Sequence, residues 1–231
     1  SSDWSSDVCS SDLVYNARKG ALHPDLVKSG LVGLSVISPA ANRALQILSV
    51  IREQHPAIRT VVGGPHVLGP DQAAAFARFA DAVVQCEGEE VIEKLARGQL
   101  EGIVQGRRVD DLDQLPIPDF SLLNPSRHLL LDYFKLTPVS TTRGCPRNCE
   151  FCTVSNIHGK RVRRRSAETV MEELRHRRQQ GYRRIFFVDD NFSVYPGQRI
   201  PLLETMARER EKGQWFQSII IQDEVPGILK G

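Results

Sequence analysis

The feature that most constrains the fold is an alternation between short apolar runs and segments of helical spacing. Runs suited to strands that are buried on both faces of a parallel sheet occur at residues 31–37, 59–62 and 81–85. Apolar side chains recur at helical spacing in residues 40–54 and 71–79, and another helix is expected to begin in residues 90–97. Strands that alternate with helices over short connections predict an α/β sheet with crossover helices.

A second α/β segment follows from residue 138 onward. Strands are expected at residues 138–142, 184–189 and 215–222, with helices at 166–180 and 200–212. Ser166 is expected to cap the first of these helices, with Glu168 in its first turn. Repeated βα units predict a barrel or half barrel.

Both α/β segments are shorter than a complete fold of their type. A doubly wound domain usually has about five or six strands, whereas three are expected here. The barrel segment likewise ends after about three βα units, out of eight in a full barrel. We therefore expect the chain to be a truncated piece of a longer protein.

The remaining segments set the expected domain boundaries. Residues 1–13 repeat Ser-Ser-Asp three times without apolar periodicity and are interpreted as a non-native tail, which removes Cys9 from further argument. Prolines between residues 107 and 137 favour an extended linker. The expected division is a tail at 1–13, a first domain at 14–106, a linker at 107–137 and a second domain at 138–231.

Composition excludes several classes of protein. The formal net charge is +2, from 30 Lys and Arg against 28 Asp and Glu, which gives no global reason to expect a nucleic-acid partner. No apolar run reaches the length of a membrane span. Three of the five cysteines lie within eight residues, a spacing that predicts a metal site in a reducing cytoplasm rather than a disulfide scaffold.

Those three cysteines, Cys145, Cys149 and Cys152, form the pattern C-x-x-x-C-x-x-C. Three thiolates on a short loop can hold three corners of a cubane iron–sulfur cluster and leave one iron open to a substrate. A zinc site is the main alternative, but it needs a fourth ligand, and His158 is the only nearby extra donor. A chance cluster of inert cysteines is the other alternative.

With Gly144 before the first cysteine and Phe151 before the last, the motif resembles the radical S-adenosylmethionine (SAM) superfamily. The resemblance implies a [4Fe–4S] cluster on the three cysteines and SAM bound to the open iron. It also implies that Phe151 packs near the adenine; simple core packing is the alternative for this ring, and it would be compatible with that role. Asp189, Asp190 and Asn191 stand at a strand end, where the matching segment of the family helps to hold the SAM amino group. The alternative is that Asp190 and Asn191 only cap the next turn.

The first domain resembles the cobalamin-binding domain that precedes the barrel in one branch of this superfamily. The resemblance is carried by Ser35, by Gly63 and Gly64, and by Glu87 and Gly88, all at expected strand ends. Glycines there would leave room for the nucleotide tail of cobalamin, and the serine would offer a hydrogen bond. His66 lies near this loop and is assigned no ligand role.

Residues 160–165 are strongly basic. A solvated edge or a contact with an anionic cofactor is a better interpretation than an RNA surface, because no aromatic side chains are interleaved with the charges.

The expected fold class is thus α/β: a partial doubly wound cobalamin-binding domain followed by a partial (βα) radical SAM barrel. The expected function is cobalamin-dependent radical methylation of an unactivated carbon in a small-molecule or lipid-like substrate, with a reductant such as flavodoxin or ferredoxin. The alternatives are a cobalamin-binding radical cyclase or rearrangement enzyme, and a non-catalytic or redox-sensing iron–sulfur protein. The truncated chain alone is expected to turn over no substrate.

Overall fold

The structure is a computed structural model that describes residues 28–120, 134–193, 196–213 and 215–223. The chain divides into two compact units, Ser1–Val109 and Asp110–Gly231, hereafter the first and second units. The expected tail at residues 1–13 and residues 121–133 of the expected linker lie outside the described residues. Among the described residues, no helix is both long enough and apolar enough to cross a membrane.

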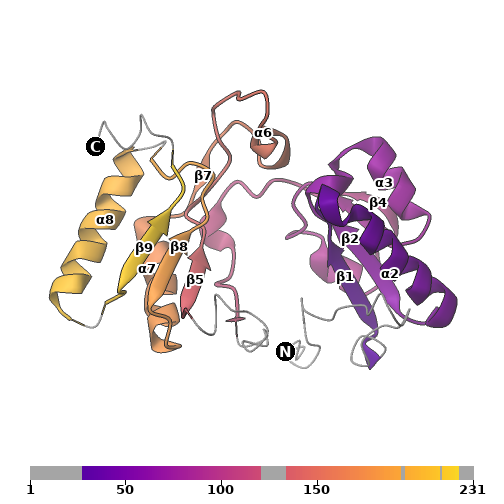
Figure 1. Cartoon of the computed structure of the whole chain (residues 1–231), viewed down its shortest axis with the longest axis horizontal. Helices are drawn as coiled ribbons and strands as arrows, with labels where there is room; N and C mark the ends of the chain where they lie inside the picture. Colours follow the sequence, from indigo (N-terminus) through magenta and orange to yellow (C-terminus); the bar gives the residue numbers. More distant parts are fainter. Residues whose placement is uncertain (1–27, 121–133, 194–195, 214, 224–231) are drawn as a thin grey trace. The chain divides into compact units, whose positions relative to one another are not determined.

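The first unit contains a four-stranded parallel sheet in the order β1-β2-β3-β4 (Figure 1). Its strands are β1 (Leu31–Ser35), β2 (Arg59–Gly63), β3 (Ala82–Gln85) and β4 (Gly102–Gln105). Its helices are α2 (Ala41–Gln54), α3 (Pro70–Ala77) and α4 (Ile92–Ala96), with 3₁₀ turns η1 (Ser38–Ala40) and η2 (Pro65–Leu68). The three expected strands and three expected helices are confirmed.

Strand β4 was not expected from the sequence. Its four residues carry only two apolar side chains, and Ile103 is 48% exposed at the edge of the sheet. An edge strand of this kind buries too little to show the apolar run that marks β1 to β3.

Helices cover both faces of this sheet. Val62 and Val83 pack with side chains of α2 and α3, whereas Val61, Ala82 and Val84 pack around Leu95 of α4. Neighbouring residues of a strand face opposite sides, so β2 is buried on both. This is the layering of a doubly wound α/β domain.

The second unit contains a three-stranded parallel sheet in the order β5-β8-β9. Its strands are β5 (Leu136–Val139), β8 (Arg184–Phe187) and β9 (Ser218–Ile221), joined through α7 (Ala167–Gln179) and α8 (Pro196–Glu211). A 3₁₀ turn, η3 (Leu112–Gln114), precedes them. The Ser166 side chain accepts a hydrogen bond from the Thr169 N–H at 3.2 Å, which confirms the expected cap of α7.

One face of this second sheet carries the core. Val139, Ile185 and Phe187 pack with side chains of α7 and α8, which lie beside the sheet in Figure 1. On the opposite face, Pro138, Phe186 and Ile220 form a row across the three strands. These three side chains are only half-buried or exposed, whereas helices cover both faces in the first unit. In βα barrel units, helices cover the outer face of the sheet and side chains of the strands line the inner face, which is the arrangement that the sequence predicts.

Candidate functional site

The parallel register of the second sheet brings three strand ends together. Val139, Phe187 and Ile221 are register partners, so the residues that follow each of them meet at the same edge of the sheet. Those segments are Ser140–Arg143, Val188–Asn191 and Gln222–Asp223. The carboxyl edge of a parallel sheet is where α/β folds bind ligands.

A short antiparallel ribbon closes the cysteine loop. Strand β6 (Thr142–Arg143) pairs with β7 (Arg163–Arg164), so residues 144–162, including the short helix α6 (Val154–Ile157), leave and return at one point. The Cys145 N–H donates to the Gly159 carbonyl at 3.2 Å, and the Cys152 N–H donates to the Cys149 carbonyl at 3.0 Å. In Figure 1 this excursion, with α6 and β7, stands at one end of the second sheet.

All three cysteines of the motif are free thiols on this loop. Cys145 is buried, Cys152 is half-buried and Cys149 is exposed. Within the described part of the chain, no three His, Cys, Asp or Glu side chains are grouped so as to hold a metal ion. The structure thus places the thiols on one short loop without converging their sulfur atoms.

The backbone conformation at the start of this loop requires a glycine at position 144. Its φ is +102°, and a Cβ atom built there would lie 2.6 Å from the Arg161 carbonyl oxygen and 2.9 Å from that of Gly159. An alanine would be strained by its backbone angle and would also collide with two backbone oxygens. The sequence predicted backbone freedom at this position, and the close approach is an additional reason.

Asp189, expected to contact a cofactor, makes a dense set of hydrogen bonds inside the protein. It is 1% exposed, and its Oδ1 accepts from the N–H and Oγ1 of Thr141, both at 2.9 Å, and from the N–H and Oγ1 of Thr142. Burial raises the pKa of Asp189, and these hydrogen bonds offset only part of that rise. The two threonines were not predicted as site residues, because nothing local marks them.

The next two residues lie beside the loop. Desolvation raises the pKa of Asp190, against the opposing charge of His158 and a hydrogen bond from the Gly144 N–H. The Asn191 side chain is buried, and its Oδ1 has no hydrogen-bond partner. The Oδ2 atom of Asp189 is also buried without a hydrogen-bond partner.

The ring of Phe151 is 90% exposed on the cysteine loop. This exposure removes the alternative that the ring belongs to a hydrophobic core. A large apolar side chain exposed on the same loop as three free thiols is available to a ligand or a partner surface.

The basic segment at residues 160–165 is only partly a solvated edge. Arg163 and Arg165 are buried, and the Arg163 guanidinium donates to the His158 carbonyl at 3.1 Å. Arg165 pairs with the buried carboxylate of Glu173, which also pairs with Arg177 at 3.2 Å. Two of the five positively charged side chains of this segment, Arg163 and Arg165, are therefore buried within the second unit and are not exposed to an anionic partner.

In the first unit, Ser35, Gly63 and Gly64 lie together at the carboxyl edge of the sheet. Ser35 and Gly63 are register partners of β1 and β2. Gly64 has φ +98°, and a Cβ there would lie 2.6 Å from the Val36 nitrogen and 2.8 Å from its carbonyl oxygen. The sequence interpretation assigned Gly64 to making room for a ligand; the structure shows that the backbone itself requires this glycine.

Glu87 and Gly88 follow β3 at the same edge. Glu87 is buried, and its carboxylate accepts a hydrogen bond from the Val109 N–H at 2.9 Å. A Cβ at Gly88 would make only an ordinary contact, 3.6 Å from Val84 Cγ1. His66, which had no assigned role, lies 3.1 Å from Ser38 Oγ through Nδ1 and packs edge-on against Phe76.

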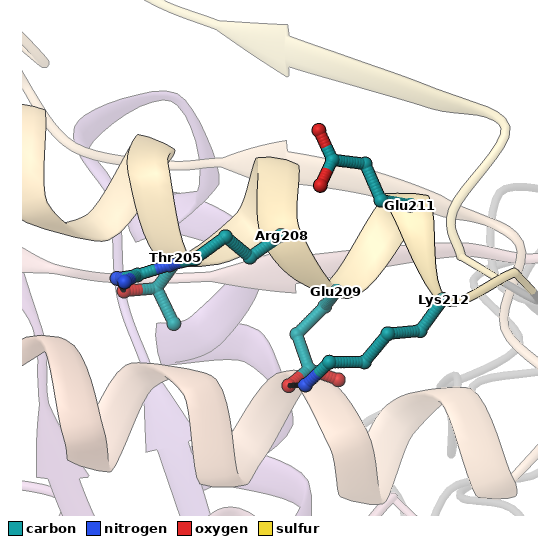
Figure 2. Close-up of a pocket in the computed structure, with 5 residues that line it drawn as sticks. All are labelled: Thr205, Arg208, Glu209, Glu211 and Lys212. Carbon is teal, nitrogen blue, oxygen red and sulfur yellow. Dashed lines mark hydrogen bonds and ion pairs between the residues drawn. The ribbon is translucent and has the colours of Figure 1, made fainter.

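A shallow hollow on α8 lies apart from these groups. Figure 2 shows it lined by Thr205, Arg208, Glu209, Glu211 and Lys212. Lys212 pairs with Glu209 at 3.2 Å and Arg208 donates to Thr205 at 3.1 Å, so these polar groups are satisfied within the helix. The hollow has the character of a charged helix surface.

Comparison with known proteins agrees with this geometry. Residues 139–223 match the radical SAM superfamily. The chain is 30% identical over 233 aligned residues to an uncharacterized methyltransferase of Pyrococcus horikoshii, covering 92% of this chain and 49% of that protein. It is 33% identical to the bacteriochlorophyllide d C-12(1)-methyltransferase of Chlorobaculum tepidum, covering 64% of this chain and 33% of that enzyme.

A solved structure shares the fold of both units. The radical SAM methyltransferase TsrM of Kitasatospora setae, with cobalamin and a [4Fe–4S] cluster bound, matches 80% of this chain and 42% of its own, with a TM-score of 0.57 and 18% identity. The chain spans about half or less of the length of these relatives. The cysteine loop at the carboxyl edge of a βα sheet and the match to the family model lead to one conclusion: residues 139–223 of this chain belong to the radical S-adenosylmethionine superfamily.

Proposed function

We propose that the second unit holds a [4Fe–4S] cluster through Cys145, Cys149 and Cys152. The residues present fit this group in two respects. Thiolate is the ligand type that iron–sulfur clusters use, and three of them stand on a loop whose two ends are fixed at one point. Gly144 forms a tight cradle at the start of that loop, which fixes the direction in which Cys145 leaves the ribbon.

We propose that SAM binds beside the cluster. A buried oxygen acceptor without a hydrogen-bond partner, Asn191 Oδ1, follows Asp190, which lies beside the loop. Buried acceptors normally have a donor, so a ligand with N–H groups fits here. The exposed ring of Phe151 fits stacking or edge contact with the adenine.

We propose that the first unit contributes to a cobalamin site at the carboxyl edge of its sheet. Ser35, Gly63 and Gly88 present little side-chain bulk there. Ile37 and Ile92 follow β1 and the β3 loop, and each is 54% exposed. Exposed aliphatic side chains beside a low-bulk edge suit contact with the flat face of a large corrin ring.

The activity that this arrangement supports best is radical methylation of an unactivated carbon in a small-molecule or lipid-like substrate. The cofactors would supply one-electron cleavage of SAM and a transferable methyl group, and the protein would supply orientation and exclusion of water. An electron donor such as flavodoxin or ferredoxin would be needed, and a reducing cytoplasm suits three free thiols. The observation that carries the proposal is the three-cysteine loop at the carboxyl edge, in a chain similar to methyltransferases.

The test is an anaerobic assay, with SAM and a reductant, of a reconstituted longer protein that contains this sequence. We expect 5′-deoxyadenosine, and with a methyl-accepting substrate also S-adenosylhomocysteine. Cys152→Ala should abolish both products, whereas Glu204→Gln, an exposed change on α8, should leave them unchanged. 5′-Deoxyadenosine without methylated product would favour a cyclase or rearrangement, and neither product would contradict a radical enzyme.

The cobalamin proposal has a separate test that needs no turnover. Gly63→Leu should weaken cobalamin binding at the carboxyl edge, because the new side chain has room within the fold but would enter the cofactor's path: the nearest atom to a Cβ there is the Val84 oxygen, at 3.9 Å. Gly30→Leu is the matched control, since Gly30 precedes β1 at the opposite edge and has nothing within 4 Å of its Cβ position. Equal cobalamin affinity in both folded variants would contradict the assignment.

A further inference from the structure

Asp189 carries an unusual hydrogen-bond load for one carboxylate oxygen. Four donors converge on its Oδ1, two from Thr141 and two from Thr142, with the Thr142 Oγ1 at 2.6 Å. The residue is 1% exposed, so the hydrogen bonds form away from bulk water, where their loss is costly. All four bonds cross a sequence separation of 47 or 48 residues.

These bonds join two segments that the backbone pairing of the sheets leaves separate. The β6–β7 ribbon and the β5-β8-β9 sheet are distinct sheets within the described residues. Thr141 and Thr142 stand where the chain leaves the sheet and enters the ribbon, four and three residues before Cys145. On the other side, Asp189 is followed directly by Asp190 and Asn191.

We propose that Asp189 is a positioning residue that sets the cysteine loop in register with the Asp190–Asn191 segment, acting through Thr141 and Thr142. Oδ1 fixes the point at which the ribbon starts, and the Gly144 N–H bond to Asp190 adds a second point two residues later. The proposal rests on the proposed cluster and SAM sites. It changes the role of Asp189, whose contribution to ligand binding is indirect.

The two oxygens of Asp189 allow a discriminating substitution. Asp189→Asn keeps an oxygen for the four donors and replaces only Oδ2, the atom without a hydrogen-bond partner, by an NH₂ group. Asp189→Ala removes the acceptor altogether. Thr142→Val removes one hydroxyl donor and leaves the backbone N–H, and Glu204→Gln is the exposed control.

The first readout is hydrogen exchange of the Thr141, Thr142 and Cys145 amides in the metal-free chain. We expect Asp189→Ala to accelerate the Thr141 and Thr142 amides by roughly tenfold or more, Thr142→Val to accelerate them less, and Asp189→Asn to match the unmodified chain. If Asp189→Ala fails to fold, Thr142→Val still decides the question. Unchanged exchange in Asp189→Ala, or in Thr142→Val when Asp189→Ala is unfolded, would overturn the proposal.

The second readout is the electron paramagnetic resonance (EPR) spectrum of the reduced, reconstituted chain with and without SAM. Asp189→Asn should retain the spectrum and its response to SAM, whereas Asp189→Ala should alter the line shape. Loss of the SAM response in Asp189→Asn, with normal amide exchange, would overturn the proposal by showing that Oδ2 contacts the ligand. If the unmodified chain takes up no iron, the proposed cluster fails, while the exchange measurement still tests the positioning role.

Discussion

Gly144→Ala is expected to destabilise the second unit far more than an alanine at another left-handed glycine. Gly181, which follows α7, is the matched control: its φ is +92°, close to +102° at Gly144, and nothing lies within 4 Å of its Cβ position. Both substitutions place an L-residue in a disfavoured backbone region, at a cost of about 1–2 kcal/mol each. Gly144→Ala adds two backbone collisions, an overpacking cost of about 1–3 kcal/mol.

The free energy of unfolding should therefore fall by about 1–2 kcal/mol in Gly181→Ala and by roughly 2–5 kcal/mol in Gly144→Ala, the sum of the two effects. Urea unfolding followed by tryptophan fluorescence in a Trp4→Phe background measures this, because the chain has two tryptophans and Trp215 packs against the core of the second unit. Equal losses in the two variants, within about 0.5 kcal/mol, would refute the argument that the loop entry has no room for a side chain.

Three further predictions concern stability. Because burial raises the pKa of Asp189, its contribution to stability is complete below the unfolded pKa of about 4 and is lost as pH rises through the folded pKa. Between about pH 3 and 7, the free energy of unfolding of the unmodified chain should therefore fall relative to that of Asp189→Asn, and a relative rise would contradict this. Glu173→Gln leaves two buried guanidinium groups without their carboxylate and should lower the free energy of unfolding in urea by about 3–5 kcal/mol. The exposed neighbour Glu172→Gln should lower it little, and equal losses would show that the buried ion pairs of Glu173 are not stabilising. Gly64→Ala should destabilise the first unit by about 2 kcal/mol or more in circular-dichroism melts and Gly63→Ala by less than 1 kcal/mol, an order that a reversed result would overturn.

The fold was largely predictable because its signals are local. Buried strands such as β2 must be apolar throughout, and α2 shows its core face as regular spacing, so both appear in a short window of sequence. Strand β4 was not predicted, because it is four residues long, lies at the edge of the sheet and exposes Ile103. No local pattern distinguishes such a strand from a loop.

The site was predictable where its residues are neighbours in sequence. Cys145, Cys149 and Cys152 lie within one loop, so their spacing alone indicates the chemistry. The bonds between Asp189 and Thr142 cross 47 residues and depend on the β5–β8 register, which sequence reasoning did not supply. Resemblance to a family predicts Asp189 as a site residue, and the three-dimensional contacts are the basis for proposing that it holds the loop.

The most direct test of the proposed cluster and SAM sites is the EPR spectrum of the anaerobically reconstituted, reduced chain before and after addition of SAM. Three cysteine ligands leave one iron open, so we expect about four irons per chain and a spectrum that changes when SAM is added. Cys149→Ala should remove the signal. Stoichiometric zinc without iron uptake, or a cluster spectrum that SAM does not alter, would contradict a radical SAM site on this loop.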